Sequence, residues 1–592
     1  MMKIFKISGF CALILTATII FIKNNCHAQT RLDRPTAIPP NLRDIVPTTP
    51  APTLPTTPLP VTPSKEELLP SPPPITPLQA PPFENITVTR FIFKGNKVFS
   101  EMELQAAYTA DLLNRPLSLA QLLEVASKVV QRYADAGYST SGAFVVLPPE
   151  TQSSGRGPVE IRVIEGELES LEVAPFTSSR LNPGYVRSRI AVAVEEPLNV
   201  NRIQEALQLL QLNPLISRIS AELTDGSAPG KSILKVQYAT EPTFNARTYL
   251  NNYRAVSIGE VERGLGITEA NVSGWGDSFS LDYRSTDGSD EIDAFYEIPF
   301  NARNGTFRFY YRTVNSRIIT KPLDKFNIRS DYSQYKLILR QPFIQKPQEE
   351  LALGVTIDRQ LSFDSIDGFG YPLSPGANNN GETNTTTLRF FQEWFQRDAV
   401  SVIALRSSFD VGVDAFGTTQ AESVTPDEVV PSSDYFLWRG QAQWVRALAP
   451  DTLFFVRGDL QLSSQNLLPI EKFALGGFGS VRGYVPNTVL DDNGLVINTE
   501  AQIALFRQNE PRMVLQLVPF FDFGVGWNAP VASFNSPSQN TLASLGLGLQ
   551  WQYQEAIVAR LDWGVPLIAI KEDENGSREQ ALSFSLFLRL RF

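Results

Sequence analysis

The chain has 592 residues, a formal charge of −10, and a composition that is 43% hydrophobic but only 19% charged. Its negative charge disfavours nucleic acid as a partner. The only histidine, His27, and both cysteines, Cys11 and Cys26, fall within the first 28 residues. If that segment is removed, the chain cannot form a disulfide, a Cys/His zinc site, a Ser-His-Asp triad or a Cys-His dyad. We therefore expect no enzymatic activity, no cofactor and no metal site.

Residues 1–28 are typical of a secretory signal peptide. Lys3 and Lys6 precede an apolar run from Ile7 to Ile22, and an imperfect small-residue cleavage site follows at Cys26-His27-Ala28. A retained membrane anchor is the alternative, but a lysine and two asparagines follow this short run. Further along, no apolar run reaches the roughly 18 to 20 residues of a membrane helix. A mature chain embedded in a membrane would therefore cross it as strands.

Residues 29–83 are dominated by proline and threonine. A segment of this composition buries no core and favours extended polyproline geometry. It is interrupted only by the short run Lys65-Glu66-Glu67-Leu68-Leu69. We expect a linker that acts as a tether or spacer.

Two similar α+β units are expected next, in residues 84–166 and 167–240. In the first unit the expected elements are strand 86–93, helices 100–113 and 118–137, and strands 141–147 and 159–164, with a turn rich in Pro, Ser and Gly between the last two. In the second unit they are strand 168–174, helices 183–193 and 200–211, and strands 216–223 and 232–239. Pro116-Leu117 and Pro197-Leu198 precede the second helix of each unit. The shared order predicts an internal repeat of about 80 residues, and two unrelated α+β domains are the alternative.

In residues 241–592 the helical periodicity gives way to alternation with a period of two residues. Leu588, Leu590 and the terminal Phe592 share one apolar face of the last strand, and arginines occupy the other. This pattern fits the wall of a membrane barrel with a polar lumen, although a soluble sandwich would also alternate. All seven tryptophans lie in this region, as interfacial aromatic belts require.

Connection lengths favour the barrel, because outer-membrane barrels alternate short periplasmic turns with long outer loops. Short turns are expected near residues 274, 302, 345, 397, 450, 507 and 553, and long connections near 256, 287, 320, 370–381, 418–433, 479–494, 528–540 and 570–577. This pattern gives 16 antiparallel strands with both chain ends on the periplasmic side. An even count closes the barrel without a free edge.

Two motifs carry a family resemblance. Gly476-Gly477-Phe478-Gly479-Ser480-Val481-Arg482-Gly483-Tyr484 lies in the sixth long connection, and Phe520-Phe521-Asp522-Phe523-Gly524 lies on the thirteenth expected strand. They resemble the VRGY motif and the F-x-D-x-G strand motif of the hemolysin secretion and activation family, the outer-membrane transporters of two-partner secretion. Together with the two α+β units, they cover the chain from about Ile86 to its end.

The resemblance implies a membrane β-barrel of 16 strands with two periplasmic POTRA-like (polypeptide-transport-associated) domains, in the outer membrane of a Gram-negative-type cell. It implies transport of a large secreted exoprotein, unfolded in transit, to the cell surface. The alternative is a barrel-assembly factor of the same superfamily, but such factors usually carry three or more periplasmic units. Family members can begin with a helix that plugs the barrel, whereas residues 29–83 are too rich in proline for one of useful length.

The motifs predict a lock between the sixth loop and the barrel wall, formed by Arg482, Gly483, Tyr484, Asp522 and Gly524. Strand alternation turns Asp522 and Gly524 into the lumen. The resemblance implies that the sixth loop folds back into the lumen, where Arg482 could pair with Asp522 in bidentate fashion. We expect two loop glycines, at positions 479 and 483, to allow the tight fold. The alternative is a solvated loop arginine and a carboxylate that lines a wet pore.

Two further sites are expected outside the lock. Ser141, Ala143 and Val145 lie on a strand that could bind the cargo polypeptide by strand addition, unless both periplasmic units are spacers. Phe592, Leu590 and Leu588 resemble the terminal signal that the cell's barrel-assembly machinery recognises, and the same strand would close the barrel. The expected partners are therefore the exoprotein, that machinery and outer-membrane lipid.

Overall fold

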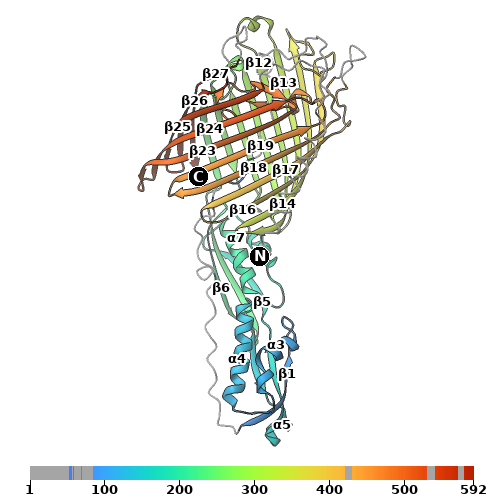
Figure 1. The fold of residues 1–592 in the computed structure, drawn as a ribbon, viewed down its shortest axis with the longest axis vertical. Helices are drawn as coiled ribbons and strands as arrows, with labels where there is room; N and C mark the ends of the chain where they lie inside the picture. The colour runs from blue at the N-terminus through green and yellow to red at the C-terminus, as the bar shows by residue number, and fades with distance from the viewer. Residues whose placement is uncertain are drawn as a thin grey trace.

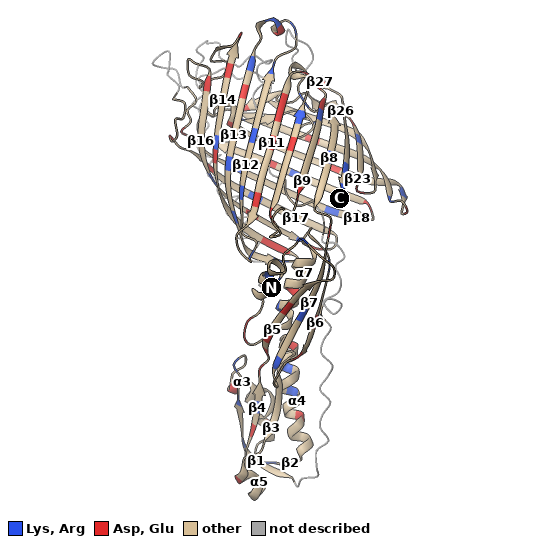
Figure 2. Cartoon of the chain, turned by 180° about the vertical axis from the view of Figure 1, so that it is seen from behind, with Lys and Arg blue, Asp and Glu red and all other residues tan. Residues whose placement is uncertain are grey.

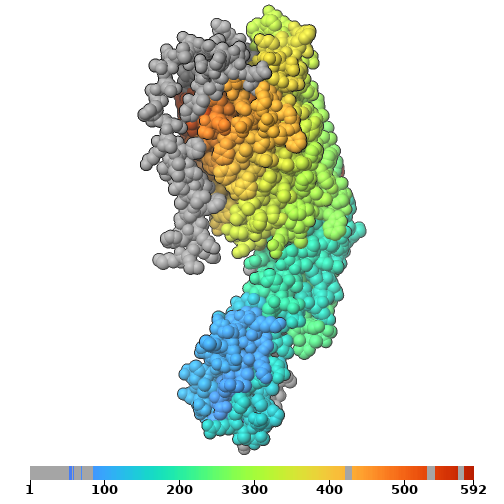
Figure 3. Space-filling view, turned by 90° about the vertical axis from the view of Figure 1, so that its right-hand side faces the viewer, coloured from blue at the N-terminus to red at the C-terminus, as the bar shows by residue number. Residues whose placement is uncertain are grey.

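The computed structural model of the chain describes residues 53–56, 58, 69, 85–420, 430–529, 540–570 and 579–592. Two small α+β domains follow one another along the long axis, and a β-barrel forms the other end of the molecule (Figure 1). Figure 3 shows the second domain between the first domain and the barrel. Within the described residues, no helix has the length and apolar character needed to cross a bilayer.

The first domain has a four-stranded sheet in the order β2-β1-β4-β3. Its elements are β1 (Ile86–Lys94), α3 (Glu101–Tyr108), η2 (Ala110–Leu112), β2 (Pro116–Leu117), α4 (Leu119–Asp135), β3 (Gly142–Val146), α5 (Pro149–Ser154) and β4 (Arg156–Ile164). Ser118 caps α4 through a capping box with Gln121. The apolar side chains of α4 recur at helical spacing and are buried in the domain core: Leu122, Val125, Ala126, Val129 and Tyr133.

Helix α5 corrects the expectation of a plain turn between β3 and β4. Pro149 occupies the first helical position, where its missing N–H costs nothing. Gly155 ends the helix in the left-handed conformation, with φ of 64°. The composition that predicted a turn therefore also suits the two ends of a short helix.

The second domain repeats the topology of the first. It contains β5 (Glu167–Pro175), α6 (Pro183–Ala191), α7 (Val200–Gln211), β6 (Ile216–Asp225) and β7 (Lys231–Thr240). In both domains the first strand pairs in parallel with the last strand, and the last pairs antiparallel with the one before it. The expected pair of α+β domains is confirmed.

The rest of the described chain forms a closed barrel of 16 antiparallel strands, as predicted. They are β8 (Phe244–Asn251), β9 (Glu262–Glu269), β10 (Ser278–Ser285), β11 (Ser289–Pro299), β12 (Thr306–Arg317), β13 (Arg329–Lys346), β14 (Glu349–Ile366), β16 (Glu382–Arg397), β17 (Ser401–Gly412), β18 (Phe436–Ala449), β19 (Thr452–Ser463), β23 (Asn493–Gln508), β24 (Met513–Trp527), β25 (Thr541–Tyr553), β26 (Ile557–Pro566) and β28 (Leu582–Arg591). Strand β28 pairs with β8 and closes the barrel.

Apolar side chains point outward from the barrel and polar ones inward. On β24 the side chain of Phe521 is 40% exposed, whereas Asp522 is fully buried. Figure 2 shows basic and acidic residues spread along the barrel strands. A wall with an apolar outer face and charges within is the arrangement of an outer-membrane barrel.

The connections alternate in length as predicted, with one exception. Residues 286–288 alone join β10 to β11, so the long connection expected near residue 287 is short. The polar run Thr286-Asp287-Gly288 suggested a loop, but such residues equally suit a tight hairpin. The sixth long connection spans residues 464–492, between β19 and β23, and is called loop 6 below.

Hydrogen bonds fix the two small domains to each other. The backbone N–H groups of Leu198 and Val200 donate to the carbonyls of Gly166 and Gly137 over 2.7 and 2.8 Å. At the same junction the Glu165 carboxylate accepts bonds from the backbone of residues 97 and 98 and from the Tyr133 hydroxyl. Burial and this carboxylate raise the pKa of Tyr133.

The second domain contacts the short turns of the barrel, which places those turns on the periplasmic side. Arg180 Nη1 lies 3.2 Å from Glu269 Oε2, and the Asn182 N–H donates to the Gly274 carbonyl over 2.8 Å. Arg189 Nε donates to Asn304 Oδ1 over 2.7 Å. These contacts lie under β9 to β12, so the second domain is attached to one part of the barrel rim.

Candidate functional site

Loop 6 folds into the barrel lumen instead of extending away from the barrel. It contains η5 (Pro469–Glu471), β20 (Phe473–Leu475), β21 (Gly483–Tyr484) and β22 (Val489–Asp491). Strands β20 and β22 form a hairpin. Leu475, Val481 and Tyr484 are fully buried and pack in one apolar cluster with Leu542 of β25. The loop therefore has its own packed core against the inner wall.

Arg482 pairs with Asp522 in bidentate geometry. Arg482 Nε lies 2.7 Å from Asp522 Oδ2, and Nη2 lies 2.8 Å from Oδ1. The Arg482 backbone N–H also donates to Oδ2 over 3.1 Å. The side chain of Arg482 is 5% exposed and that of Asp522 is fully buried. The structure thus brings together the two residues of the predicted pair. Bidentate charge-assisted hydrogen bonds of this kind are strong and geometrically specific.

Neighbouring strands add charges that the sequence analysis did not identify. Arg482 Nη1 lies 2.9 Å from Glu500 Oε2 on β23 and 3.7 Å from Asp562 Oδ1 on β26. Arg560 bridges the same two carboxylates, at 3.0 Å from Glu500 and 2.7 Å from Asp562. We call these residues, with Asp522, the Arg482 anchor. Three carboxylates and two guanidinium groups leave it with an excess of negative charge.

Two uncharged groups complete the pocket for Arg482. Asn498 Nδ2 donates to Asp522 Oδ1 over 2.9 Å. The Phe520 ring lies beside the Arg482 guanidinium, with 3.5 Å between the guanidinium carbon and the ring centroid. Asn498 stands opposite Asp522 in the β23–β24 register. Pairing the expected neighbouring strands in the sequence would have found Asn498.

Glycines leave the space that loop 6 needs. Gly483 has a φ of 92°, and a Cβ on Gly524 would lie 2.9 Å from side-chain atoms of Leu475 and Val481. Gly476 and Gly477 also have positive φ. The prediction for Gly479 was wrong, because its φ is not positive and a Cβ there would meet nothing within 4 Å. The chain turns at the first two glycines of the motif and at Gly483.

Tyr484 attaches loop 6 to β25 and to the connection that follows β26. Its hydroxyl oxygen lies 2.8 Å from the Ala543 carbonyl oxygen and 2.9 Å from that of Ile568, and these two acceptors share its single proton. Gly483 and Tyr484 pair with β27 (Glu579–Gln580), which precedes the last barrel strand. The five residues of the predicted lock therefore lie in one region of the lumen, where Arg482 and Tyr484 make the polar contacts and the glycines permit the approach.

A second anchor holds the opposite end of loop 6 and was not foreseen. Glu471 Oε1 lies 2.8 Å from Arg389 Nη2 of β16, and Glu471 Oε2 lies 2.8 Å from Arg439 Nη2 of β18. Gln360 Nε2 of β14 donates to Glu471 Oε1 over 2.6 Å. Glu471 is fully buried. We call this group the Glu471 anchor.

Further carboxylates neutralise the arginines of the Glu471 anchor. Arg389 Nη2 lies 3.1 Å from Asp358 Oδ2, and its Nη1 pairs with Asp410. Arg439 Nη1 lies 3.3 Å from Asp410. These inward-facing charges lie at alternate positions of predicted strands, but no motif marks Glu471 itself.

Part of the proline-rich segment contacts the inner wall of the barrel. Gln443 Nε2 of β18 donates to the Pro55 carbonyl over 2.8 Å. The next residue, Trp444, is exposed on the outer face, so alternation turns Gln443 inward. Leu69 is buried in the core of the second domain, and Gln204 Nε2 donates to its carbonyl over 3.4 Å. This segment therefore touches both the lumen and the second domain, which a plain spacer would not require.

The expected cargo strand lies at an edge of the sheet, and the side chains of its three predicted residues are directed away from that edge or lie outside the strand. β3 is the last strand in the order β2-β1-β4-β3. Ser141 precedes the strand, is buried, and its Oγ accepts a bond from the Gly166 N–H over 3.0 Å. Ala143 and Val145 pack against the domain core. Phe144, at 41% exposure, and the strand backbone are what this edge presents.

The terminal residues lie on the outer face of the barrel. Leu588 and Leu590 stand opposite Thr248 and Ala246 in the β28–β8 register. The Phe592 N–H donates to the Phe244 carbonyl over 2.9 Å, and the Phe592 side chain is 67% exposed. The strand closes the barrel and leaves its last apolar side chain accessible.

Two segments of the chain match known families. Residues 230–551 match the family described as Haemolysin secretion/activation protein ShlB/FhaC/HecB, and residues 86–166 match the ShlB-type POTRA domain. The first match covers more than half of the chain and includes loop 6, Asp522 and the Glu471 anchor. The predicted resemblance is confirmed.

Known relatives are similar over more than two thirds of their length, and one solved structure shares the fold. The outer membrane transporter CdiB of Dickeya dadantii is 21% identical over 414 residues, which cover 69% of this chain and 70% of the relative. The heme/hemopexin transporter protein HuxB of Haemophilus influenzae is 21% identical over 463 residues, 74% of this chain and 76% of the relative. The structure of CdiB from Escherichia coli has a TM-score of 0.66 at 18% identity, covering 90% of this chain and 94% of that one. The chain therefore belongs to the haemolysin secretion/activation family, the outer-membrane transporters of two-partner secretion, and its N-terminal domains are periplasmic.

Proposed function

We propose that this transporter exports one large exoprotein, unfolded in transit, and that loop 6 governs passage through the lumen. The observation that carries the proposal is the bidentate pair between Arg482 and Asp522, buried inside the barrel. Buried charges hold loop 6 across the lumen at two places. While the exoprotein passes, the loop therefore moves, or stays in place, as one unit. Its anchors therefore set how much of the lumen is open.

Capture of the cargo is proposed to occur at sheet edges of the periplasmic domains. β3 ends the first sheet, and β5 and β6 end the second. An extended chain that adds to an edge gains main-chain hydrogen bonds with little demand on its sequence. Exposed Phe144 adds an apolar contact at the β3 edge. An unfolded exoprotein, which offers backbone everywhere, suits this mode of binding.

The driving force is proposed to come from the cargo itself. The sequence has no nucleotide-binding motif, and the periplasm supplies no ATP. Binding at the domains and folding of the exoprotein outside the cell would make the transfer directional. No catalytic role is proposed for any residue.

Insertion of the transporter is proposed to depend on the cell's barrel-assembly machinery and on Phe592. The exposed terminal ring and the closing strand support a recognition role. Phe592→Ser should lower the amount of heat-modifiable, folded barrel in the outer membrane. Phe369→Ser, at a similarly exposed ring between β14 and β16, is the control. Normal insertion of the Phe592 variant would refute the recognition role.

The export function is tested by deleting residues 86–164 and measuring how much of the partner exoprotein reaches the cell surface. We expect export to stop while the barrel still inserts, because the barrel closes on its own strands. Undiminished export would make the first domain a spacer. A loss of unrelated outer-membrane barrels in cells without the transporter would instead indicate a barrel-assembly factor.

A further inference from the structure

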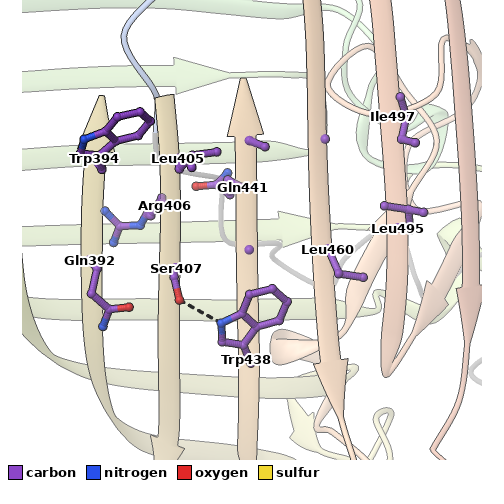
Figure 4. A pocket seen from close by; sticks show the side chains of 13 residues that line it. Gln392, Trp394, Leu405, Arg406, Ser407, Trp438, Gln441, Leu460, Leu495 and Ile497 are labelled. Carbon is purple, nitrogen blue, oxygen red and sulfur yellow. Dashed lines mark hydrogen bonds between the residues drawn. The ribbon is translucent and has the colours of Figure 1, made fainter. Parts of the chain in front are cut away.

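A groove crosses the outer wall of the barrel over β16 to β23 (Figure 4). Five residues stand in register across it: Gln392, Ser407, Gly440, Leu460 and Leu495. Neighbouring positions of the same parity, such as Leu388, Ile403 and Phe436, are exposed and apolar. The groove therefore faces the bilayer and not the lumen.

Small residues form the floor of the groove and two indole rings stand beside it. Gly458 lies opposite Ala442 in the β18–β19 register. A Cβ on Gly458 would meet only the Val496 carbonyl, at 3.8 Å, so the space above it is open. Trp394 and Trp438 line the groove, whose volume is about 260 Å³. Pockets for drug-sized ligands have volumes of roughly 300 to 1,000 Å³, so this smaller groove is suited to part of one acyl chain.

Two glutamines that line the groove each have a buried polar atom without a partner among the described residues, but Gln441 donates through its Nε2 to Asp459, whereas Gln392 makes no side-chain hydrogen bond through its amide nitrogen. Gln392 Nε2 is buried and makes no hydrogen bond within the part of the chain that the structure describes. Trp438 and Ser407 satisfy each other, because Trp438 Nε1 donates to Ser407 Oγ over 2.9 Å (Figure 4). A buried amide without a partner costs free energy in hydrocarbon. A bound acceptor would remove that cost.

The depth of Gln392 indicates which acceptor is available. Trp394, two residues nearer the periplasmic end of β16, donates through Nε1 to Glu349 Oε1 over 3.2 Å. Glu349 begins β14 beside a periplasmic turn, so Trp394 lies at the membrane interface. Gln392 is therefore just inside the periplasmic leaflet, at the level of lipid ester groups. That leaflet consists of phospholipid, whereas lipid A occupies the other one.

We propose that this groove binds an acyl chain of a periplasmic-leaflet phospholipid, with the Gln392 amide donating to its ester carbonyl. The chain lies over Gly458 and Gly440, between the Trp394 and Trp438 rings. The site differs from the lumen site in position and in ligand. It gives the transporter a specific lipid contact on the wall that carries the Glu471 anchor, since β16 and β18 contribute to both.

The test is photolabelling of the full-length protein in vesicles of phosphatidylethanolamine and phosphatidylglycerol. A small fraction of the phosphatidylethanolamine carries a diazirine on its acyl chain, and labelled peptides are quantified after digestion. We expect labelling of β18 and β19 to exceed that of β11 by roughly fivefold, which corresponds to about 1 kcal/mol of preference. Equal labelling of the two walls would overturn the proposal.

Two variants and a matched control locate the site. Gly458→Leu places a side chain in the groove, with a Cβ that meets only the Val496 carbonyl, so labelling of β18 and β19 should fall to the β11 level. Gln392→Leu should lower it roughly threefold, the effect of one hydrogen bond. Ala294→Leu adds the same side chain on β11 and should change nothing there. Undiminished labelling in Gly458→Leu would overturn the proposal.

A third experiment measures competition between lipids for the groove of the unaltered protein. Its result therefore does not depend on whether a variant folds. Unlabelled ester phospholipid should compete several-fold better than its ether analogue, which lacks the carbonyl acceptor. Equal competition by the two lipids would refute the role of Gln392. Stronger competition by lipid A than by phospholipid would refute the assignment to the periplasmic leaflet.

Discussion

Loop 6 is held at two places in the lumen by anchors of opposite charge. At one, an arginine of the loop meets carboxylates of β23, β24 and β26. At the other, a glutamate of the loop meets arginines of β16 and β18. Because the polarities are opposite, neither part of the loop can occupy the other's place without burying like charges together. Charge therefore specifies the orientation of the loop as well as its attachment.

Loop 6 contributes a guanidinium group to one anchor and a carboxylate to the other, and this predicts which anchor is the more sensitive to losing its loop residue. The Arg482 anchor already has one negative charge in excess, so losing Arg482 leaves three carboxylates with Arg560 alone. In the Glu471 anchor, Asp358 and Asp410 remain beside Arg389 and Arg439 when Glu471 is lost. Losing Arg482 should therefore weaken the attachment of loop 6 more than losing Glu471.

The largest effect is expected when both anchors are removed. In Arg482→Ala combined with Glu471→Ala, loop 6 loses its charged attachment to both walls. The anchors share no partner, so their effects should be nearly additive. Single-channel conductance in planar bilayers should exceed that of either single variant. A double variant no more conductive than Arg482→Ala would show that one anchor alone holds the loop.

Arg482→Ala alone should have the next largest effect. Breaking a buried pair costs about 3 to 5 kcal/mol, less where lumen water reaches the remaining carboxylates. Asp522→Ala should give the same loss of exoprotein secretion, and the double variant of this pair should be little worse than either one. Lys325→Ala in another outer loop is the control. Simple addition of the two defects would show that the residues act separately.

Glu471→Gln should have a smaller effect than Arg482→Ala. The amide keeps the size of the side chain and one acceptor oxygen, while the remaining carboxylates still neutralise both arginines. Conductance should rise modestly and secretion should persist at a reduced level. A defect as large as that of Arg482→Ala would reverse the proposed ranking of the anchors.

The smallest effect is expected from a surface ion pair in the first domain, which serves as a reference for the buried anchors. Lys94, 60% exposed, and Arg162, 48% exposed, lie 2.9 and 2.6 Å from the Glu160 carboxylate and hold its pKa below the ordinary value. The stabilisation is complete above the ordinary pKa of about 4.3 and is lost as pH falls through the lowered one. Solvent limits it to less than about 1 kcal/mol.

Hydrogen exchange of β1 and β4 in the full-length protein measures this contribution. At pH 7 the strands of the Glu160→Gln variant should open slightly more often than those of the unaltered chain, and the difference should shrink as the pH falls through the lowered pKa of Glu160. A difference that persists at low pH would show that the carboxylate charge is not its source.

Much of the architecture followed from patterns that repeat along the chain. Alternation identified the barrel strands and the inward direction of Asp522, and the matched order of elements identified both periplasmic domains. The Arg482–Asp522 contact joined two motifs that the family resemblance brought together. Each of these predictions rested on many residues or on a recognisable motif, so single errors mattered little.

The failures concern single residues whose role depends on tertiary contacts. Glu471 has no motif around it, and its buried position depends on where η5 ends inside the lumen. Gly479 and Gly483 are equivalent in sequence terms, yet only Gly483 adopts positive φ. Ser141 fitted a strand pattern, but its hydroxyl accepts the Gly166 N–H at the domain junction. Sequence periodicity carries no information on such partners.

Through the contact between Pro55 and Gln443, the N-terminal segment occupies a surface of the lumen wall. It therefore competes, within the same molecule, with any peptide that would bind that surface. Because Leu69 is fixed in the second domain, Pro55 stays near the lumen wall at an effective concentration on the order of mM. A free peptide that used the same surface would have to exceed that concentration or bind more tightly. If cargo binds the periplasmic domains as proposed, it meets the first condition, because it is then tethered to the same molecule. The contact would therefore exclude free peptides because they are not tethered, whatever their sequence.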